Sequence, residues 1–431
     1  MIGSMIGSGG VIGGILLALL LARVWVFIAL FAAGIFALTF ISNLPIEKIL
    51  ALSVLNVTTS TELLALPLFI LMAEILFQTD LSQSLFRGLA PWTNRLPGKL
   101  VHVNVVGCTM FSAVSGSSAA TALTVGRITL KELLARGYDK SLAIGSLAGA
   151  GTLGFLIPPS LILIIYGVLA ETSIIKLFIA GIAPGLLLAF LYSAYVGARA
   201  LADPSLTPGP EDSTTWRERI RGLRALLPVT ALILAVIGSL YAGIASPTES
   251  AAVGVFGALL IGAGQGRLNA SSLKTALLCA VLTSSMAGLI LAAGSFFSVS
   301  LAYLGAPQAA ADFIASMELS GAQLIFALLV VYLILGMFLD GMSTIIMTLP
   351  ITLPLVVAAG FDPVWFGVFL VLVVEMAQIT PPVGFNLFVL ESLTGESIAR
   401  IARYAFPFFL ITMAVTVLIT LFPQVVLFAV R

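Results

Sequence analysis

The chain has 431 residues, of which 60% are hydrophobic and only 9% are charged. Soluble globular proteins carry roughly 25% charged residues, so a soluble fold of this size is excluded. The 40 glycines and 20 prolines lie among long apolar runs, which is typical of a polytopic all-α membrane protein with interrupted helices. The 20 basic and 19 acidic residues nearly cancel, which argues against a basic surface for nucleic acid.

The N-terminal region, residues 1–61, is predicted to hold the first membrane crossings. Arg23 is the only charged residue before Ser42, and a single long span would bury it at mid-bilayer without a partner. Two short spans, over about 2–21 and 24–42, instead place Arg23 in a turn at the surface. No basic residue precedes the apolar run, so a cleaved signal peptide is not expected.

Further apolar segments follow, and a spanning helix needs roughly 20 residues. They cover about 62–78, 100–124, 141–170, 176–199, 226–245, 249–265, 273–304, 321–357, 365–390 and 404–429. The stretches 82–95 and 306–318 mix polar and apolar residues at helical spacing, which predicts short interfacial helices. Residues 202–225 are polar, proline-rich and charged, and form a predicted cytoplasmic linker between two units, 62–201 and 226–431.

The two units are predicted to be copies of one membrane repeat. Three prolines recur at a shift of 223 residues: Pro158, Pro159 and Pro184 as Pro381, Pro382 and Pro407. The short loops of the first copy are rich in Lys and Arg, whereas none occurs from Thr275 to Ala399. Short basic loops stay cytoplasmic, so the copies are predicted to insert in opposite orientations, as inverted-topology repeats do.

Each copy is predicted to contain a re-entrant hairpin and a helix broken by a proline pair. Basic loops on both sides of 100–124 make this segment enter and leave by one face, and symmetry predicts the same for 321–357. The broken helices are 141–170 and 365–390. Proline lacks an N–H and clashes with the carbonyl one turn earlier, so carbonyls upstream of each pair lose their helical partners.

Carbonyl and hydroxyl oxygens suit a hard cation, and Na⁺ is the cation predicted here. Helix N-termini at the same places suit an anionic group on a substrate. The candidate sodium ligands are Ser115, Gly116, Ser117, Ser118, Thr121, Thr152, Gly154, Pro158, Asp340, Gly341, Ser343, Thr344, Thr380, Pro382 and Gly384. The candidate substrate contacts are Ser117, Ser118, Pro159, Met342, Pro381, Asn386 and Glu375.

These clusters also have plainer interpretations. Small residues serve close packing of membrane helices, and proline pairs occur as simple kinks. Two such clusters, each ahead of a proline pair in opposed copies, favour a binding site. Asn386 has an interhelical hydrogen bond as its alternative role. Glu375 is a functional candidate because it lies within the membrane, but it also has the alternatives of local pairing or a protonated state against protein.

An enzymatic function has no support in the sequence. His102 is the single histidine, and Cys108 and Cys279 lie inside apolar segments, so neither a metal-ligand set nor a disulfide framework is formed. Neither an HExxH nor a Walker A motif is present. A passive channel is an alternative, but two closed hairpins fit a carrier better.

Several segments resemble a known family: FSAVSGSSAATALTVGRI, AGTLGFLIPPSLILIIYGVLAETSI, GMFLDGMSTIIMTLPITLPLV and ITPPVGFNLFV. They are similar to the large membrane subunit (M subunit) of tripartite ATP-independent periplasmic (TRAP) transporters, of the ion transporter superfamily, over nearly the whole chain. The resemblance implies a sodium-driven symporter of an organic acid with an elevator mechanism, in the bacterial inner membrane. Arg23 departs from the pattern, since many relatives have Gly or Pro there.

The same resemblance implies two partners, a small four-helix membrane subunit and a periplasmic substrate-binding protein, and no organic cofactor. It implies that family sodium sites use the hairpin tips and broken helices, here Ser115, Gly116, Ser117, Ser118, Gly341, Ser343, Thr380 and Pro382. The alternative function is a stand-alone carboxylate carrier, driven by an ion gradient, that needs no binding protein.

Overall fold

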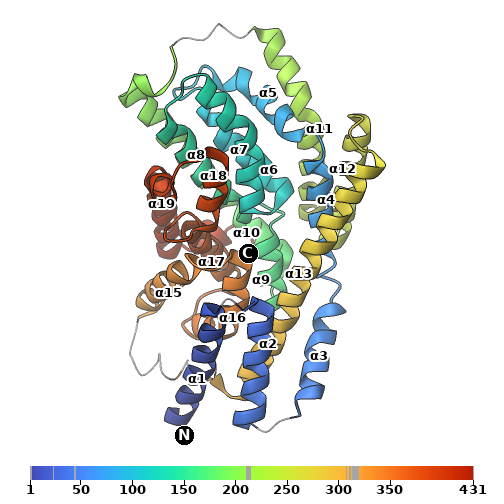
Figure 1. Ribbon diagram of the computed structural model, residues 1–431, viewed down its shortest axis with the longest axis vertical. Coiled ribbons are helices and arrows are strands. Elements are labelled where there is room, and N and C mark those ends of the chain that lie inside the picture. Colours follow the sequence, from blue (N-terminus) through green and yellow to red (C-terminus); the bar gives the residue numbers. More distant parts are fainter. Residues whose placement is uncertain are drawn as a thin grey trace.

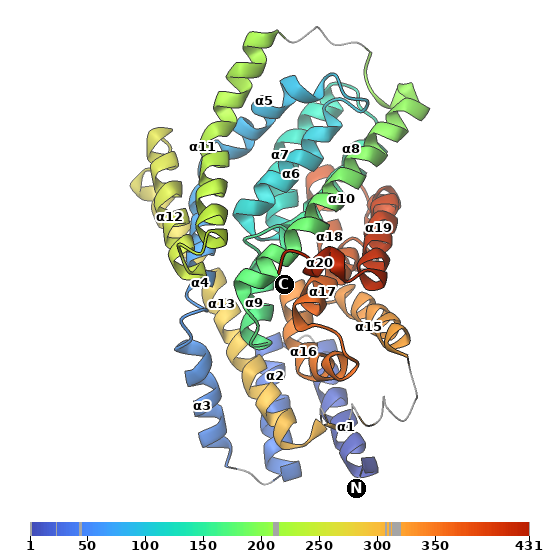
Figure 2. The same ribbon diagram turned by 180° about the vertical axis from the view of Figure 1, so that it is seen from behind.

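The computed structural model describes residues 2–22, 24–42, 45–209, 215–306, 308–309, 312 and 320–430. These residues form an elongated bundle of helices without a strand (Figures 1 and 2). Within the described part, six helices are long and apolar enough to cross a membrane.

The helices follow one another along the chain with short connections. They are α1 (Ile2–Leu21), α2 (Val26–Phe36), α3 (Ile46–Thr58), α4 (Ala65–Phe77), α5 (Leu81–Thr93), α6 (Val101–Ser115), α7 (Ser118–Ala135), α8 (Lys140–Thr152), α9 (Leu161–Leu169), α10 (Ile174–Ala202), α11 (Trp216–Tyr241), α12 (Pro247–Gly264), α13 (Ala270–Tyr303), α15 (Gly321–Gly336), α16 (Gly341–Ala358), α17 (Pro363–Gln378), α18 (Phe385–Thr394), α19 (Ile398–Leu421) and α20 (Gln424–Leu427).

The N-terminal helices follow the two predicted short spans. α1 and α2 coincide with them, and α2 continues as a π-helical turn over Ala37–Ser42. Arg23 lies outside the described residues, so its predicted turn stays a prediction. α3 was not predicted as a separate helix, because its polar residues, such as Glu47 and Asn56, made the segment look like a connection.

Two helices extend past the predicted segments by more than a turn. α7 continues to Ala135, past the predicted hairpin end at 124, because Val125, Leu130 and Leu133 keep a buried apolar face on the same helix. α11 begins at Trp216, inside the predicted linker. A capping box starts it there: the Thr215 N–H donates to Glu218 Oε2 over 2.7 Å, and the Glu218 N–H donates to Thr215 Oγ1.

The predicted amphipathic stretch 82–95 is helical as α5, which packs against α6 and α11. Its interfacial position stays a prediction. The second such stretch, 306–318, lies mostly outside the described residues.

Two helical hairpins point at the middle of the bundle from opposite ends. The first, α6–α7, lies in the upper half of Figure 1, and the second, α15–α16, lies in the lower half. Two interrupted helices, α8 with α9 and α17 with α18, pack against these hairpins: α8 and α18 contact the first hairpin, and α9 and α17 contact the second. α17 is the centre of the core, since every residue from Val364 to Gln378 is buried.

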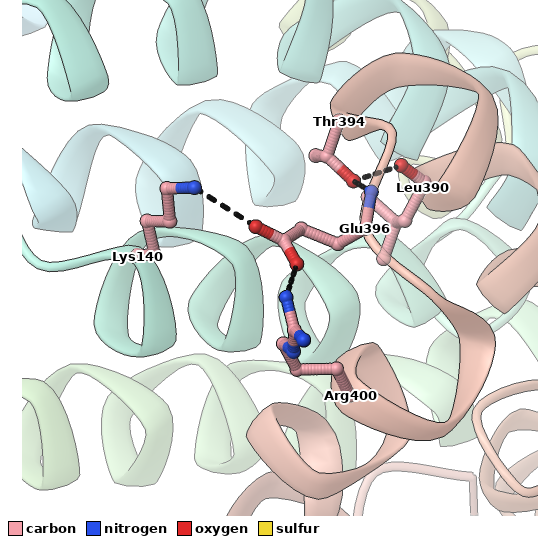
Figure 3. A network of polar contacts seen from close by, with 5 residues as sticks. All are labelled: Lys140, Leu390, Thr394, Glu396 and Arg400. Carbon is pink, nitrogen blue, oxygen red and sulfur yellow. Dashed lines mark hydrogen bonds and ion pairs between the residues drawn. The ribbon is translucent and has the colours of Figure 1, made fainter.

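An ionic network fastens the start of α8 to the loop between α18 and α19 (Figure 3). Lys140 Nζ lies 2.9 Å from Glu396 Oε1, and Arg400 pairs with the other carboxylate oxygen. Hydrogen bonds from Lys140 and Arg400 therefore lower the pKa of Glu396 below its ordinary value of 4.5. The network joins residues that are distant in sequence at one end of the bundle.

This network predicts a pH dependence of stability. Because the pKa of Glu396 is lower in the folded state, its stabilising effect is complete above pH 4.5 and is lost as the pH falls through the lowered value. Glu396→Gln is expected to lower the melting temperature at neutral pH. It should also reduce the fall in melting temperature that acidification causes in the parent chain. Thermal unfolding in detergent measures both effects. Glu391→Gln is the control, since Glu391 forms no ion pair with a described residue. Equal pH profiles for Glu396→Gln and the parent chain would contradict this role.

Candidate functional site

The tip of the first hairpin is a sharp turn that only a glycine fits. Gly116 ends α6 with a φ of 58°, a left-handed conformation that L side chains rarely adopt. A Cβ at this position would lie 2.8 Å from the carbonyl oxygen of Pro159. The Leu161 N–H donates to the Gly116 carbonyl over 3.3 Å. The tip therefore rests directly on the first proline pair.

Hydroxyl groups are concentrated at this tip. Ser115 Oγ and Thr121 Oγ1 are 2.6 Å apart, and Thr121 Oγ1 donates to the Ser117 carbonyl over 2.8 Å. Ser117 also caps α7, and Ser118 and Thr121 are fully buried. Hydroxyls that donate their protons to protein oxygens keep lone pairs free to act as ligands.

The first proline pair interrupts its helix as the sequence predicts. α8 ends at Thr152, a 3₁₀ turn covers Leu153–Phe155, and α9 starts only at Leu161. Gly154 in this turn faces the hairpin tip, since a Cβ there would lie 2.5 Å from the Ser117 carbonyl oxygen. The break and the tip are thus in backbone contact.

The second hairpin turns at Asp340, which caps α16. Its carboxylate accepts from the Ser343 N–H over 3.2 Å and from the Ser343 hydroxyl, and its carbonyl accepts from Thr344 Oγ1 over 2.9 Å. A Cβ on Gly341 would lie 2.7 Å from Ile162 of α9 and 2.8 Å from Val374 of α17. The second tip therefore packs against both interrupted helices.

The second proline pair also interrupts its helix. α17 ends at Gln378 and α18 begins at Phe385. Thr380 Oγ1 donates to the Met376 carbonyl over 2.7 Å. Gly384 has a φ of 51°, and its N–H donates to the carbonyl of Met337 at the end of α15 over 3.1 Å. This bond ties the second break to the second hairpin.

A further bond joins the second break to the first hairpin. Asn386 Nδ2 donates to Ser118 Oγ, and both residues are fully buried. Asn386 therefore makes the interhelical hydrogen bond that was its alternative role. Its Oδ1 has no hydrogen-bond partner among the described residues.

A cavity of about 290 Å³ lies where the two tips and the two breaks converge. It is lined by Ser117, Ala119, Phe155, Thr283, Met286, Ala287, Ile290, Asp340, Gly341, Met342, Gln378 and Phe385. Both hairpins, both interrupted helices and the long helix α13 contribute to its wall. Ligand pockets in proteins are typically of this kind, mostly apolar with a few convergent polar groups.

Among the candidate substrate contacts, only Ser117 and Met342 line this cavity. Ser118, Pro159, Pro381, Asn386 and Glu375 are not among the residues that line it. Glu375 is fully buried, and neither carboxylate oxygen has a partner among the described residues.

Gln378, Thr283 and Met286 line the cavity but were not predicted as site residues. Gln378 is 1% exposed and neither end of its amide has a partner in the described part of the chain. A polar residue just before a proline pair was the available signal for Gln378. Thr283 and Met286 lie in the middle of an uninterrupted helix and had no local signal.

The arrangement of helices is that of known membrane transporters. The solved structure of the YdaH transporter from Alcanivorax borkumensis superimposes with a TM-score of 0.58 at 13% identity, over 87% of each chain. MtrF from Neisseria gonorrhoeae gives a TM-score of 0.53 at 14% identity, over 86% of this chain and 83% of the other. At these identities the likeness concerns the fold, and it defines the class: a polytopic helical membrane protein with a transporter fold.

The family follows from the sequence comparisons. A model of the tripartite ATP-independent periplasmic transporter DctM component matches residues 14–425. The chain belongs to this family, as its large membrane subunit, and is a multi-pass inner-membrane protein. The resemblance read from its motifs is thereby confirmed.

Named relatives are transport permeases. The ectoine/5-hydroxyectoine TRAP transporter large permease protein UehC of Ruegeria pomeroyi is 33% identical over 367 residues, which are 85% of each chain. The C4-dicarboxylate TRAP transporter large permease protein DctM of Pseudomonas aeruginosa is 32% identical over 379 residues, 87% of this chain and 88% of the other.

Proposed function

We propose that the chain is the transporting subunit of a sodium-coupled importer that takes up an organic acid through the central cavity. One observation carries the proposal: both hairpin tips and both helix breaks line one cavity of about 290 Å³. Discontinuous helices at the interface of two repeats are the usual place for substrate and coupling ion in secondary transporters.

The residues at both tips fit Na⁺. The first site would use hydroxyls of the Ser115–Ser118 tip and Thr121 with carbonyls around 152–159. The second would use 340–344 with 380–384. All of these donors are hard oxygen atoms. In the first site, Thr121 donates its proton to a backbone carbonyl, which leaves its oxygen lone pairs for the cation. Thr380 does the same in the second site.

The polar groups at the cavity suit a carboxylate. The N-termini of α7, α16 and α18 lie at the tips and the second break, so free N–H groups and partial positive charge meet there. The relatives' names include C4-dicarboxylates and ectoine, and that of a Haemophilus influenzae relative, 29% identical over 94% of this chain and 67% of its own, includes sialic acid. These names support the class of organic acids and leave the particular substrate open.

The opposed hairpins support movement by an elevator mechanism. The α6–α7 and α15–α16 hairpins point at the middle of the bundle from opposite ends (Figures 1 and 2). Residues of both hairpin tips line the cavity. We infer that they are inverted repeats, and that they travel with the interrupted helices as one body past the remaining helices.

Two partners complete the proposed transporter, a small membrane subunit and a periplasmic binding protein. A relative in Oleidesulfovibrio alaskensis, named isethionate TRAP transporter permease protein DctMQ, is 30% identical over 90% of this chain but only 60% of its own length. The additional length of that relative supports a second membrane component beside this chain.

Sodium binding is testable without knowledge of the substrate. Na⁺, compared with K⁺, is expected to raise the melting temperature of the purified protein, because a ligand of the native state stabilises it. Ser117→Ala and Thr380→Ala should each raise the Na⁺ concentration for half of this effect by about tenfold, which corresponds to the loss of ~1.4 kcal/mol of binding free energy.

Thr420→Ala is the matched control. Like Thr380, Thr420 on α19 donates its hydroxyl proton to the carbonyl four residues earlier, here that of Thr416 over 2.8 Å. Thr420 does not line the cavity. If Ser117→Ala, Thr380→Ala, Thr420→Ala and the parent chain all show the same Na⁺ dependence, the two proposed sodium sites are contradicted. Uptake into liposomes by this chain alone, without the binding protein, would favour the stand-alone carrier instead.

A further inference from the structure

A second pocket, separate from the central cavity and lined in part by polar side chains, opens between α8, α10 and α19. Its volume is about 200 Å³, and it is lined by Ser141, Leu142, Tyr195, Arg199, Arg403, Tyr404, Pro407 and Phe408. It shares no lining residue with the central cavity. The proposed transport mechanism assigns it no role.

Two arginines give this pocket an excess of positive charge. Arg199 comes from the last turn of α10 and Arg403 from the second turn of α19. Neither forms an ion pair with a described residue.

The acidic residues around the pocket already have other partners. Glu396 pairs with Lys140 and Arg400 (Figure 3). Asp139 accepts from the Ser141 hydroxyl and from the Leu142 N–H. Asp203 accepts from the N–H and the hydroxyl of Ser205. These bonds from Ser205 lower the pKa of the Asp203 carboxyl, and Arg199 also attracts this carboxyl and helps to lower its pKa. Neither guanidinium group forms an ion pair with a described residue, so both can still bind an anion from outside the chain.

The pocket has a polar and an apolar end. α10 ends at Ala202 and α19 begins at Ile398, so a rise of 1.5 Å per residue puts both arginines within about 8 Å of a helix end. Pro407 and Phe408 lie one turn deeper along α19. The surface of α19 exposes Phe406 at this level and Leu410 further along the helix. A phospholipid has a matching arrangement, with a charged headgroup at the membrane surface and hydrocarbon chains below it.

We propose that this pocket binds the phosphate headgroup of an anionic phospholipid of the cytoplasmic leaflet. Arginine holds phosphate with paired N–H donors. Tyr195 and Tyr404, which also line the pocket, carry hydroxyl groups that can donate as well. The acyl chains would follow the exposed side chains of α19. Basic pockets between membrane helices on the cytoplasmic side bind lipid headgroups in this way, and the basic linker after α10 predicts that side.

The test uses the full-length chain, extracted in mild detergent and examined by native mass spectrometry. Phosphatidylglycerol and cardiolipin are expected to bind, and phosphatidylcholine is not. The double variant Arg199→Gln/Arg403→Gln should weaken phosphatidylglycerol binding by at least about tenfold, since each basic residue near a membrane surface attracts anionic lipid. Arg403→Lys keeps the charge but loses the paired donors, so an intermediate loss is expected.

The matched control is Arg217→Gln/Arg221→Gln, which removes the same charge from exposed positions of α11. An equal loss in this control would show that net charge alone attracts the lipid and would overturn the site. Displacement of the lipid by millimolar inorganic phosphate would point to a free anion as the ligand, and equal binding of phosphatidylcholine would also contradict the proposal. The test does not depend on sodium coupling, so it can fail while the proposed function holds.

Discussion

Gly154→Ala is expected to abolish sodium-dependent transport while leaving the protein in the membrane. A Cβ at this position would lie 2.5 Å from the Ser117 carbonyl oxygen and 2.7 Å from the Ser118 nitrogen. Both atoms belong to the backbone, so the first hairpin tip must move away from the first helix break. Overpacking of this kind costs about 1–3 kcal/mol, and it separates the proposed ligands of the first sodium site.

Two measurements check this expectation: Na⁺-driven uptake in liposomes that contain the complete transporter, and the Na⁺-dependent shift of the melting temperature. Gly238→Ala on α11 is the control, because a Cβ there meets no atom within 4 Å. Normal uptake and a normal Na⁺ shift in Gly154→Ala would show that the contact between tip and break has no part in transport.

The second large effect is expected from the proline pairs. Replacement of Pro158-Pro159 or of Pro381-Pro382 by Ala-Ala restores the missing N–H groups and favours a continuous helix. The carbonyls proposed to hold Na⁺ would then be engaged in helical hydrogen bonds. Uptake should fall by at least about 100-fold, which corresponds to ~2.7 kcal/mol, with amounts in the membrane near those of the parent chain.

Pro184→Ala/Pro228→Ala is the matched control for each pair. Both prolines lie inside continuous helices, α10 and α11, and neither lines the central cavity. The control should transport normally. Full activity of the Ala-Ala variants would show that the two breaks are incidental to the mechanism.

Local chemistry explains what was predictable in this sequence. The helix breaks at Pro158 and Pro381 were predictable because proline disrupts the hydrogen bonds of its own helix. The turn at Gly116 was predictable because small residues cluster there. The extent of α7 was not, because amphipathic spacing after residue 124 continues into a stretch with several charges.

Contacts between helices that are distant in sequence could not be predicted. The sequence around Gly341 does not indicate its contact with Ile162. The sequence around Asn386 does not indicate its hydrogen bond to Ser118. The same holds for the α13 side of the cavity, because a residue such as Thr283 gains its role only from helices that pack against it. Glu375 is a different case: an intramembrane carboxylate suggested a substrate contact, and the side chain is fully buried and is not among the residues that line the cavity.

The complete burial of α17 has a consequence for how the molecule is assembled. Helices of the first unit, including α9 and α10, cover one part of its surface, and helices of the second, including α15 and α19, cover another. A C-terminal half synthesised alone would leave the apolar sides of this helix without their protein neighbours. We therefore expect that the halves, if produced as separate polypeptides, accumulate only when they are made together in one cell.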